Sequence, residues 1–284
     1  MPNRIIRIQP DMTGRSGRTG FVRMALGAAL FMSCCGIAAA ADISLAERLD
    51  LFRKAYPGVV ASVQGNTMTL VNGKSFPVDD GRTKDHQDKL KDADVENMLS
   101  QIYPLGKCFS GKVPLNSDPG RIRHLPLMMA IFGETKGQVV SRSERINWFG
   151  QKLTFTKVAG AGEAIRAVKA DLEKLPAKFR KFYRKSGGTF VWRYVAGTKR
   201  LSQHSFASAI DVNTAFTDYW RWSGGKPGKV PKYKNRIPME IVEIFERHGF
   251  IWGGKWYHYD TMHFSYRLDL IAIGKLAAER GFVE

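Results

Sequence analysis

Strand-length apolar segments alternate with helix-length amphipathic segments over the last ~120 residues, and this alternation constrains the fold most strongly. The segments "TFVWRYVAG" (189–197) and "ASAIDVN" (207–213) are rich in β-branched, aromatic or other apolar residues and predict strands. The stretch "FIWGGKWYHYDTMHFSYR" (250–267) predicts one or two more strands around a Gly-Gly turn. Such short strands, interspersed with helices, are typical of an α+β fold with a small sheet.

Three helices are predicted beside these strands. Apolar residues at 164, 165, 168, 172 and 175 recur at helical spacing, and Pro176 stops that helix. Pro238 begins a second helix that ends at Gly249, and a last helix is expected over 268–280. The C-terminal part is therefore predicted to be a small antiparallel sheet flanked by helices.

The region before this part has its own signals. Residues 58–79 alternate between apolar and polar side chains, with Gly-Asn and Asn-Gly turn signals between them. This pattern predicts a small β-hairpin or meander. Residues 104–123 are rich in Pro and Gly and contain "DPGRIR", a turn signal that carries two arginines.

The N-terminus has the three parts of a secretory signal peptide. Five arginines lie within the first 23 residues, an apolar run extends from Phe21 to Ile37, and the run ends in "IAAAAD". Cleavage is expected near Ala40 or Ala41, which makes residues 1–41 the signal peptide. The uncharged run after Arg23 is short for a membrane span, so no stable span is expected after cleavage. An uncleaved anchor is the alternative.

The net charge and the number of cysteines indicate which partners the protein can bind and what can stabilise its fold. Without residues 1–41 the net charge falls from +18 to +14, and Cys108 is the only cysteine left. Because one thiol cannot form an internal disulfide, an exported chain must rely on its core or on a metal. The positive charge favours anionic partners such as an acidic cell-wall polymer. Nucleic acid is not expected, because the protein is predicted to be exported and its basic residues are spread among acidic ones.

Two segments carry a possible metal site. "RLSQHSFASAIDVN" places His204 seven residues before Asp211, and "YHYDTMHF" (257–264) contains two of the six histidines of the chain. His204, Asp211 and His263 would offer three nitrogen and oxygen ligands and leave one position open, as in catalytic zinc sites. Asp260, three residues before His263, could take a proton from the attacking water as a general base.

Spacing alone leaves alternatives to this assignment. In an extended strand, residues 258 and 260 lie on the face opposite 263, so a turn or bulge is needed to bring either one to His263. His258 therefore competes as a ligand. His204 and Asp211 could instead be a turn cap and a strand-end aspartate.

The order of these residues resembles the motifs of the zinc-dependent peptidoglycan peptidases. This superfamily includes the D-alanyl-D-alanine carboxypeptidases, the vancomycin-resistance D,D-dipeptidases and the endolysin L-alanyl-D-glutamate peptidases. The matching residues are Ser202, His204, Ala209, Asp211, Asp260 and His263. The resemblance implies a hedgehog/DD-peptidase-like fold with one catalytic Zn²⁺ bound by His204, Asp211 and His263, and with Asp260 as the base. It leaves His258 outside the ligand set.

The resemblance also implies a substrate and a domain division. Arg193 matches the arginine that faces the substrate in this family, and its guanidinium suits a peptide carboxylate. Ser202 could donate to a carbonyl or carboxylate of the substrate. The expected protein is an exported, periplasmic or wall-associated peptidase that acts on peptidoglycan stem peptides. Its peptidase domain would span 101–284, with 42–100 as a β-hairpin and helix extension.

Two positions depart from the family pattern. Ala207 replaces the usual glycine of the first motif, and Ser265 stands where the family commonly has glutamate. Loss of a glutamate that orients a zinc ligand would weaken metal binding or activity. The alternative function is therefore a catalytically weak or inactive zinc-containing wall-binding module. Which stem-peptide bond is cut, and whether the enzyme is an endo- or a carboxypeptidase, is left open by the motifs.

Overall fold

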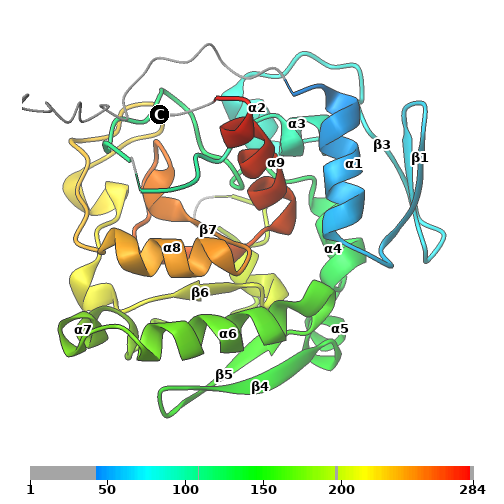
Figure 1. Cartoon of the computed structure of the whole chain (residues 1–284). Coiled ribbons are helices and arrows are strands. Elements are labelled where there is room, and N and C mark those ends of the chain that lie inside the picture. Colours follow the sequence, from blue (N-terminus) through cyan, green and yellow to red (C-terminus); the bar gives the residue numbers. More distant parts are fainter. Residues whose placement is uncertain (1–42, 108, 196–197, 282–284) are drawn as a thin grey trace, which may run out of the picture. The chain divides into compact units, whose positions relative to one another are not determined.

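The computed structural model describes residues 43–107, 109–195 and 198–281 (Figure 1). The helices are α1 Leu45–Ala55, α2 His86–Lys91, α3 Val95–Leu99, α4 Leu125–Phe132, α5 Lys136–Ser141, α6 Ala161–Glu173, α7 Arg180–Tyr183, α8 Met239–Arg247 and α9 Leu268–Glu279. The strands are β1 Val60–Gln64, β2 Thr67–Leu70, β3 Ser75–Pro77, β4 Ser143–Trp148, β5 Gln151–Thr156, β6 Ala209–Asp211, β7 Phe250–Trp252 and β8 His263–Tyr266. Helices mixed with small antiparallel sheets confirm the α+β class.

The predicted signal peptide, residues 1–41, lies outside the described residues. Among the helices listed above, none has the length and apolarity needed to cross a membrane.

A three-stranded antiparallel sheet in the order β6-β8-β7 forms the centre of the C-terminal part. In its register Asp211 is paired with His263, and Phe264 of β8 lies between Ile210 and Trp252. Because side chains alternate along a strand, this register places Asp211 and His263 on one face and Ile210, Phe264 and Trp252 on the other. The sheet therefore has one face for a core and one for a site.

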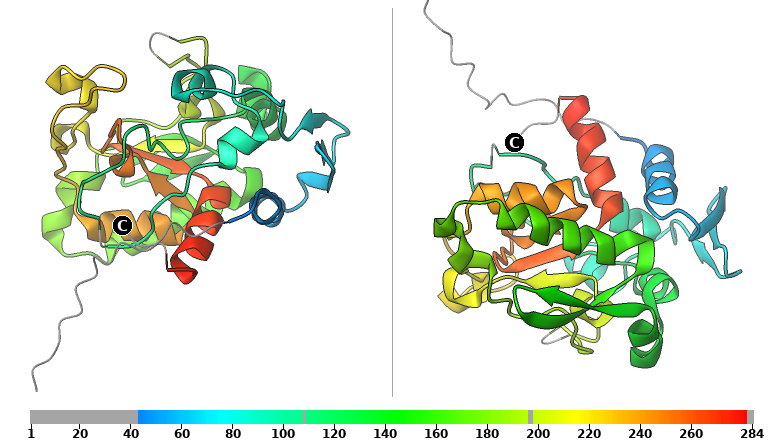
Figure 2. Two further views of the ribbon diagram at one scale, coloured as in Figure 1. Left: turned by 90° about the horizontal axis from the view of Figure 1, so that it is seen from above. Right: turned by 60° about the horizontal axis from the view of Figure 1, so that its bottom comes forward.

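The core behind the sheet is aromatic. Phe245 of α8 stacks on Phe264 of β8 with ring centroids 3.9 Å apart, and Phe250 packs edge-on against Phe245. Helices α6 and α8 contact each other, and α6 also contacts the β4–β5 hairpin (Figures 1 and 2). The sequence did not predict that hairpin, whose turn requires positive φ at Phe149 and Gly150.

The N-terminal region forms an antiparallel meander, β1-β2-β3, followed by short helices. Helix α1 lies beside α9 in all three views (Figures 1 and 2). Phe52 of α1 and Tyr56, which caps the end of α1, belong to the same buried apolar cluster as Leu270 and Ile273 of α9. Residues of the 43–100 region therefore share a hydrophobic core with the last helix.

The strand expected over 189–197 is a wrong prediction for its described part, residues 189–195. In and beside this segment the described backbone forms only isolated bridges, Gly188 with Asp211 and Tyr194 with Leu201. Val191 and Tyr194 are exposed, at 51% and 59% of their surface. The β-branched and aromatic residues of this segment therefore belong to an irregular, partly exposed stretch and not to a buried strand of a sheet.

Candidate metal centre and active site

Three side chains converge at the polar end of the central sheet. Asp211 is the last residue of β6, His263 is the first residue of β8, and His204 lies on the short 3-10 helix Gln203–Phe206 that precedes β6. His204 Nε2 lies 3.1 Å from His263 Nδ1 and 3.2 Å from Asp211 Oδ1. His263 Nδ1 lies 3.1 Å from Asp211 Oδ1. The three atoms therefore form a nearly equilateral triangle.

This triangle fits a metal ion. Ligands bound tetrahedrally to zinc at about 2.0–2.1 Å lie roughly 3.3 Å from one another. His204 Nδ1 lies 2.7 Å from the carbonyl oxygen of Thr189, so Nδ1 carries the proton and Nε2 offers a lone pair. His263 Nε2 lies 2.6 Å from Ser265 Oγ, which can accept its proton and leave the Nδ1 lone pair free. Two imidazoles and a carboxylate aimed at one point are a donor set that zinc prefers.

The charges of the triad also depend on one another. Burial alone would lower the pKa of His204, but the Asp211 carboxylate outweighs it and raises that pKa. At His263 burial prevails and lowers the pKa. The lowered pKa keeps the His263 imidazole neutral, the form that binds metal, whereas the raised pKa of His204 means that metal must displace a proton there at low pH.

Asp260 lines the cavity that also contains these three side chains, and a turn in the backbone brings it there. Its backbone N–H donates to Gly253 O at 2.9 Å, and His263 N–H donates to Asp260 O at 3.2 Å, so residues 260–263 are not extended. Asp260 Oδ1 is buried and accepts no hydrogen bond from any residue that the structure describes. Burial, and then the nearby Asp211 carboxylate, raise the pKa of Asp260 to about 7. A carboxylate with this pKa can exchange a proton near neutral pH.

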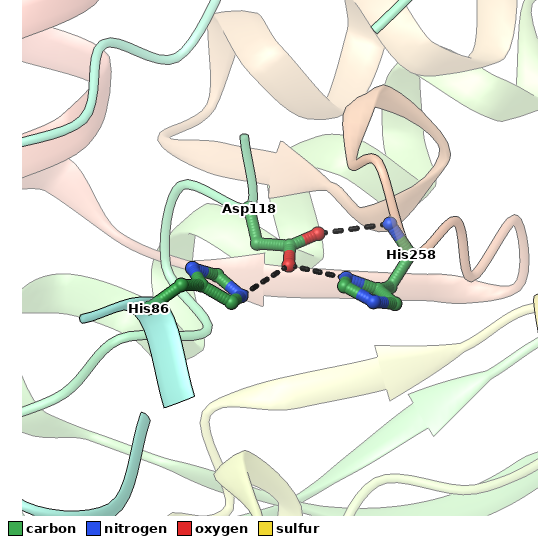
Figure 3. Close-up of side chains that lie close together, drawn as sticks. All are labelled: His86, Asp118 and His258. Carbon is green, nitrogen blue, oxygen red and sulfur yellow. Dashed lines mark hydrogen bonds and ion pairs between the residues drawn. The ribbon is translucent and has the colours of Figure 1, made fainter. Parts of the chain in front are cut away.

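His258 makes a different set of contacts, which Figure 3 shows. Its backbone N–H donates to Asp118 Oδ1 at 2.9 Å, and its Nδ1 lies 2.6 Å from Asp118 Oδ2. His86 Nε2 lies 3.3 Å from the same Oδ2, and the His86 ring stacks on His258. His86, Asp118 and His258 are close enough to form a second candidate metal group.

The contacts of this second group favour hydrogen bonding over metal binding. The Gly228 N–H donates to His258 Nε2 at 3.1 Å, so His258 Nδ1 carries the proton and donates it to Asp118. The 2.6 Å separation is that of a strong hydrogen bond and is shorter than the roughly 3.3 Å between two zinc ligands. Arg121 Nη1 also lies 3.4 Å from Asp118 Oδ2 and disfavours a further cation there.

The predicted substrate residues line the same cavity, whose volume is about 340 Å³. Arg193 is exposed, and its backbone carbonyl accepts from the Ser202 N–H at 2.9 Å. Ser202 is buried, and its Oγ accepts from the His204 N–H at 3.3 Å, which caps the 3-10 helix. Both residues stay predictions as substrate contacts.

The structure shows the surroundings of the two residues that depart from the family pattern. Ala207 has a φ of +52°, a left-handed conformation that favours glycine. Ser265 lies two residues after His263 on β8, on the same face, and contacts its Nε2. This contact was not predicted from the sequence, although the spacing of two residues on a strand could have indicated it.

One comparison with known proteins matches the part of the chain that contains these residues. Residues 196–266 match the model of a family described as D-alanyl-D-alanine carboxypeptidase. The match contains all three candidate ligands and Asp260, and it confirms the resemblance to the zinc peptidase superfamily. Neither a curated protein nor a solved structure matches the chain.

Proposed function

We propose that this protein is an exported zinc metallopeptidase that hydrolyses an amide bond in the peptide stems of peptidoglycan. One observation carries the proposal: the ligand atoms of His204, Asp211 and His263 lie 3.1–3.2 Å apart in a cavity that also contains Asp260. The family match over 196–266 supports the peptidase class.

Each residue has a distinct task in this proposal. His204, Asp211 and His263 hold the zinc ion, which supplies Lewis-acid chemistry when bound. Asp260 takes a proton from the attacking water and returns it to the leaving amine. Burial, and then the Asp211 carboxylate, raise the pKa of Asp260 above that of an ordinary aspartate, which favours uptake of the proton from water.

Charge supports an anionic substrate. Five arginines line the cavity, namely Arg121, Arg123, Arg193, Arg200 and Arg221, whereas its carboxylates are Asp211 and Asp260. The stems of peptidoglycan carry free carboxylates. A mature chain with a net charge of +14 would be attracted to such a polymer, and Arg193 would hold one carboxylate beside the scissile bond.

The test is mass spectrometry of the products formed from defined muropeptides by the zinc-loaded mature protein. We expect amide cleavage by the wild type, and we expect Asp260→Asn to retain zinc while losing hydrolysis. A wild type that binds zinc and releases no product from any stem peptide would contradict the proposal. Retention on insoluble peptidoglycan without product would favour the wall-binding module instead.

A further inference from the structure

The "DPGRIR" turn holds two arginines against the cavity. Asp118 is fixed by the backbone and ring N–H groups of His258, at 2.9 and 2.6 Å (Figure 3). Trp256 Nε1–H donates to Pro119 O at 2.7 Å. Gly120 has a φ of +93°, and a side chain there would collide with Ile251. The backbone of the turn is therefore held in place up to its first arginine.

Arg121 and Arg123 both line the cavity, as does Arg200. Arg123 Nη2 donates to Leu201 O at 2.9 Å, and its Nη1 donates to Gly120 O at 3.3 Å. Arg200 Nη1 donates to Arg121 O at 2.9 Å. These contacts orient the guanidinium groups but add no negative charge, since every acceptor is a neutral carbonyl.

The arginines are poorly neutralised. Arg121 lies 3.4 Å from Asp118, whose charge it shares with His258 and His86. Within the described part of the chain, neither Arg123 nor Arg200 forms an ion pair with a carboxylate. Burial, and then the neighbouring guanidinium groups of Arg200, Arg267 and Arg121, hold the pKa of Arg123 well below its usual range. Burial and Arg121 lower the pKa of Arg200 to about 10.

The number of free donors exceeds what one carboxylate can use. A guanidinium has five N–H donors, and a carboxylate has two oxygens that two bidentate arginines would already occupy. Arg123 uses one donor from each of two nitrogens, and Arg200 uses one donor, in the contacts given above. With Arg193 also at the cavity, the site has donors for at least two anionic groups.

We propose that Arg121, Arg123 and Arg200 form a subsite for a second carboxylate of the peptide substrate, separate from the one assigned to Arg193. This inference rests on the proposed function and specifies its substrate as a stem peptide with at least two free carboxylates. The α-carboxylate of a D-glutamate residue within the stem has the required chemistry, because it is free and planar and can accept bidentate hydrogen bonds.

The test uses two synthetic stem peptides that differ at one group. One contains D-glutamate with a free α-carboxylate, and the other contains D-isoglutamine, in which that group is an amide. The zinc-loaded wild type should hydrolyse the acid with a kcat/KM roughly 10- to 100-fold higher than the amide, the range for hydrogen bonds to a charged group. In Arg200→Gln this ratio should fall towards one.

Lys199→Gln is the matched control, because it removes one positive charge from an exposed neighbour that does not line the cavity. This variant should keep the acid-over-amide ratio of the wild type. A wild type that hydrolyses both peptides equally well would overturn the subsite. So would an Arg200→Gln variant that keeps the full ratio.

A binding measurement separates this inference from the proposed function. Calorimetric titration of both peptides into zinc-loaded wild type and Arg200→Gln needs no turnover. If no peptide is cleaved but the acid binds more tightly than the amide only when Arg200 is present, the proposed function fails and the subsite stands. If cleavage occurs and neither the binding nor the hydrolysis distinguishes acid from amide, the subsite fails and the proposed function stands.

Discussion

Ser265 Oγ lies 2.6 Å from Nε2 of His263, the nitrogen opposite the one that faces Asp211 and His204. The two residues are neighbours on the same face of β8, so the contact follows from the strand itself. A serine can therefore orient the imidazole and keep its Nδ1 lone pair available, the task expected of the glutamate that the family commonly has at this position.

Loss of this contact should weaken metal binding. We expect Ser265→Ala to reduce zinc affinity roughly 10- to 100-fold, as is usual when a group that orients a ligand is removed. Competition with a chromogenic chelator at fixed pH measures the change. Ser265→Thr keeps the hydroxyl and is the control. Equal zinc affinity in wild type and Ser265→Ala would show that the contact has no orienting role.

The two histidines of "YHYDTMHF" should respond differently to substitution. His263→Ala removes one of the three proposed ligands and should abolish stoichiometric zinc binding. His258→Gln should retain one zinc per chain, because His258 contacts Asp118 instead of the triad. Inductively coupled plasma mass spectrometry of the dialysed proteins measures the zinc content of both variants. A loss of zinc in His258→Gln with the fold intact by circular dichroism would contradict this assignment.

Asp118 should make stability depend on pH. Burial alone would raise the pKa of its carboxyl group, but Arg121 and the hydrogen bonds from His258 and His86 hold it well below its usual range. A depressed folded pKa means that the carboxylate stabilises the fold above the unfolded pKa of about 3.9, and that this stabilisation is lost as the pH falls below it.

Asp118→Asn should therefore lower the free energy of unfolding at pH 7 by roughly 1–3 kcal/mol. The variant should also lose less stability than the wild type between pH 5 and pH 3, a window around the unfolded pKa of about 3.9. Urea unfolding at several pH values tests both. Glu240→Gln, which changes an exposed carboxylate of α8, is the control. Parallel pH profiles for wild type and Asp118→Asn would contradict the prediction.

A buried ion pair joins Lys255, just after β7, to Glu246 of α8, and hydrogen bonds connect the pair to residues 103–106. Lys255 Nζ lies 2.7 Å from Glu246 Oε1 and also donates to the carbonyls of Pro104 and Gly106. Tyr103 Oη donates to Glu246 Oε1 at 2.6 Å. Lys255→Met leaves a buried carboxylate without its cation and should cost about 3–5 kcal/mol of unfolding free energy.

The matched comparison for this pair is Lys107→Met. Lys107 is largely exposed, with its Nζ 3.5 Å from Glu243, so its removal should cost at most about 1 kcal/mol. Denaturant unfolding of both variants measures the difference. Equal destabilisation by the two substitutions would show that burial does not control the strength of the Lys255 pair.

Local signals in the sequence predicted much of the C-terminal fold. Helices α6, α8 and α9 and strand β6 form where apolar spacing, proline and glycine indicated them. These signals are reliable because they depend on residues a few positions apart. The composition of 189–197 led to the wrong prediction of a strand. Val191 and Tyr194 are exposed, and no neighbouring strand runs alongside the described part of this segment.

The residue types at the candidate metal site were also determined by the sequence, but their convergence was not. Whether Asp260 or His258 would approach His263 depends on two contacts. One is the turn at 260–263, and the other is the hydrogen bond between the His258 ring and Asp118, which lies 140 residues before it. The β6–β8 register decides that Asp211 faces His263. Hydrogen bonds across such sequence separations have no local pattern, so only the tertiary structure could place the triad, its serine partner and the arginines of the cavity.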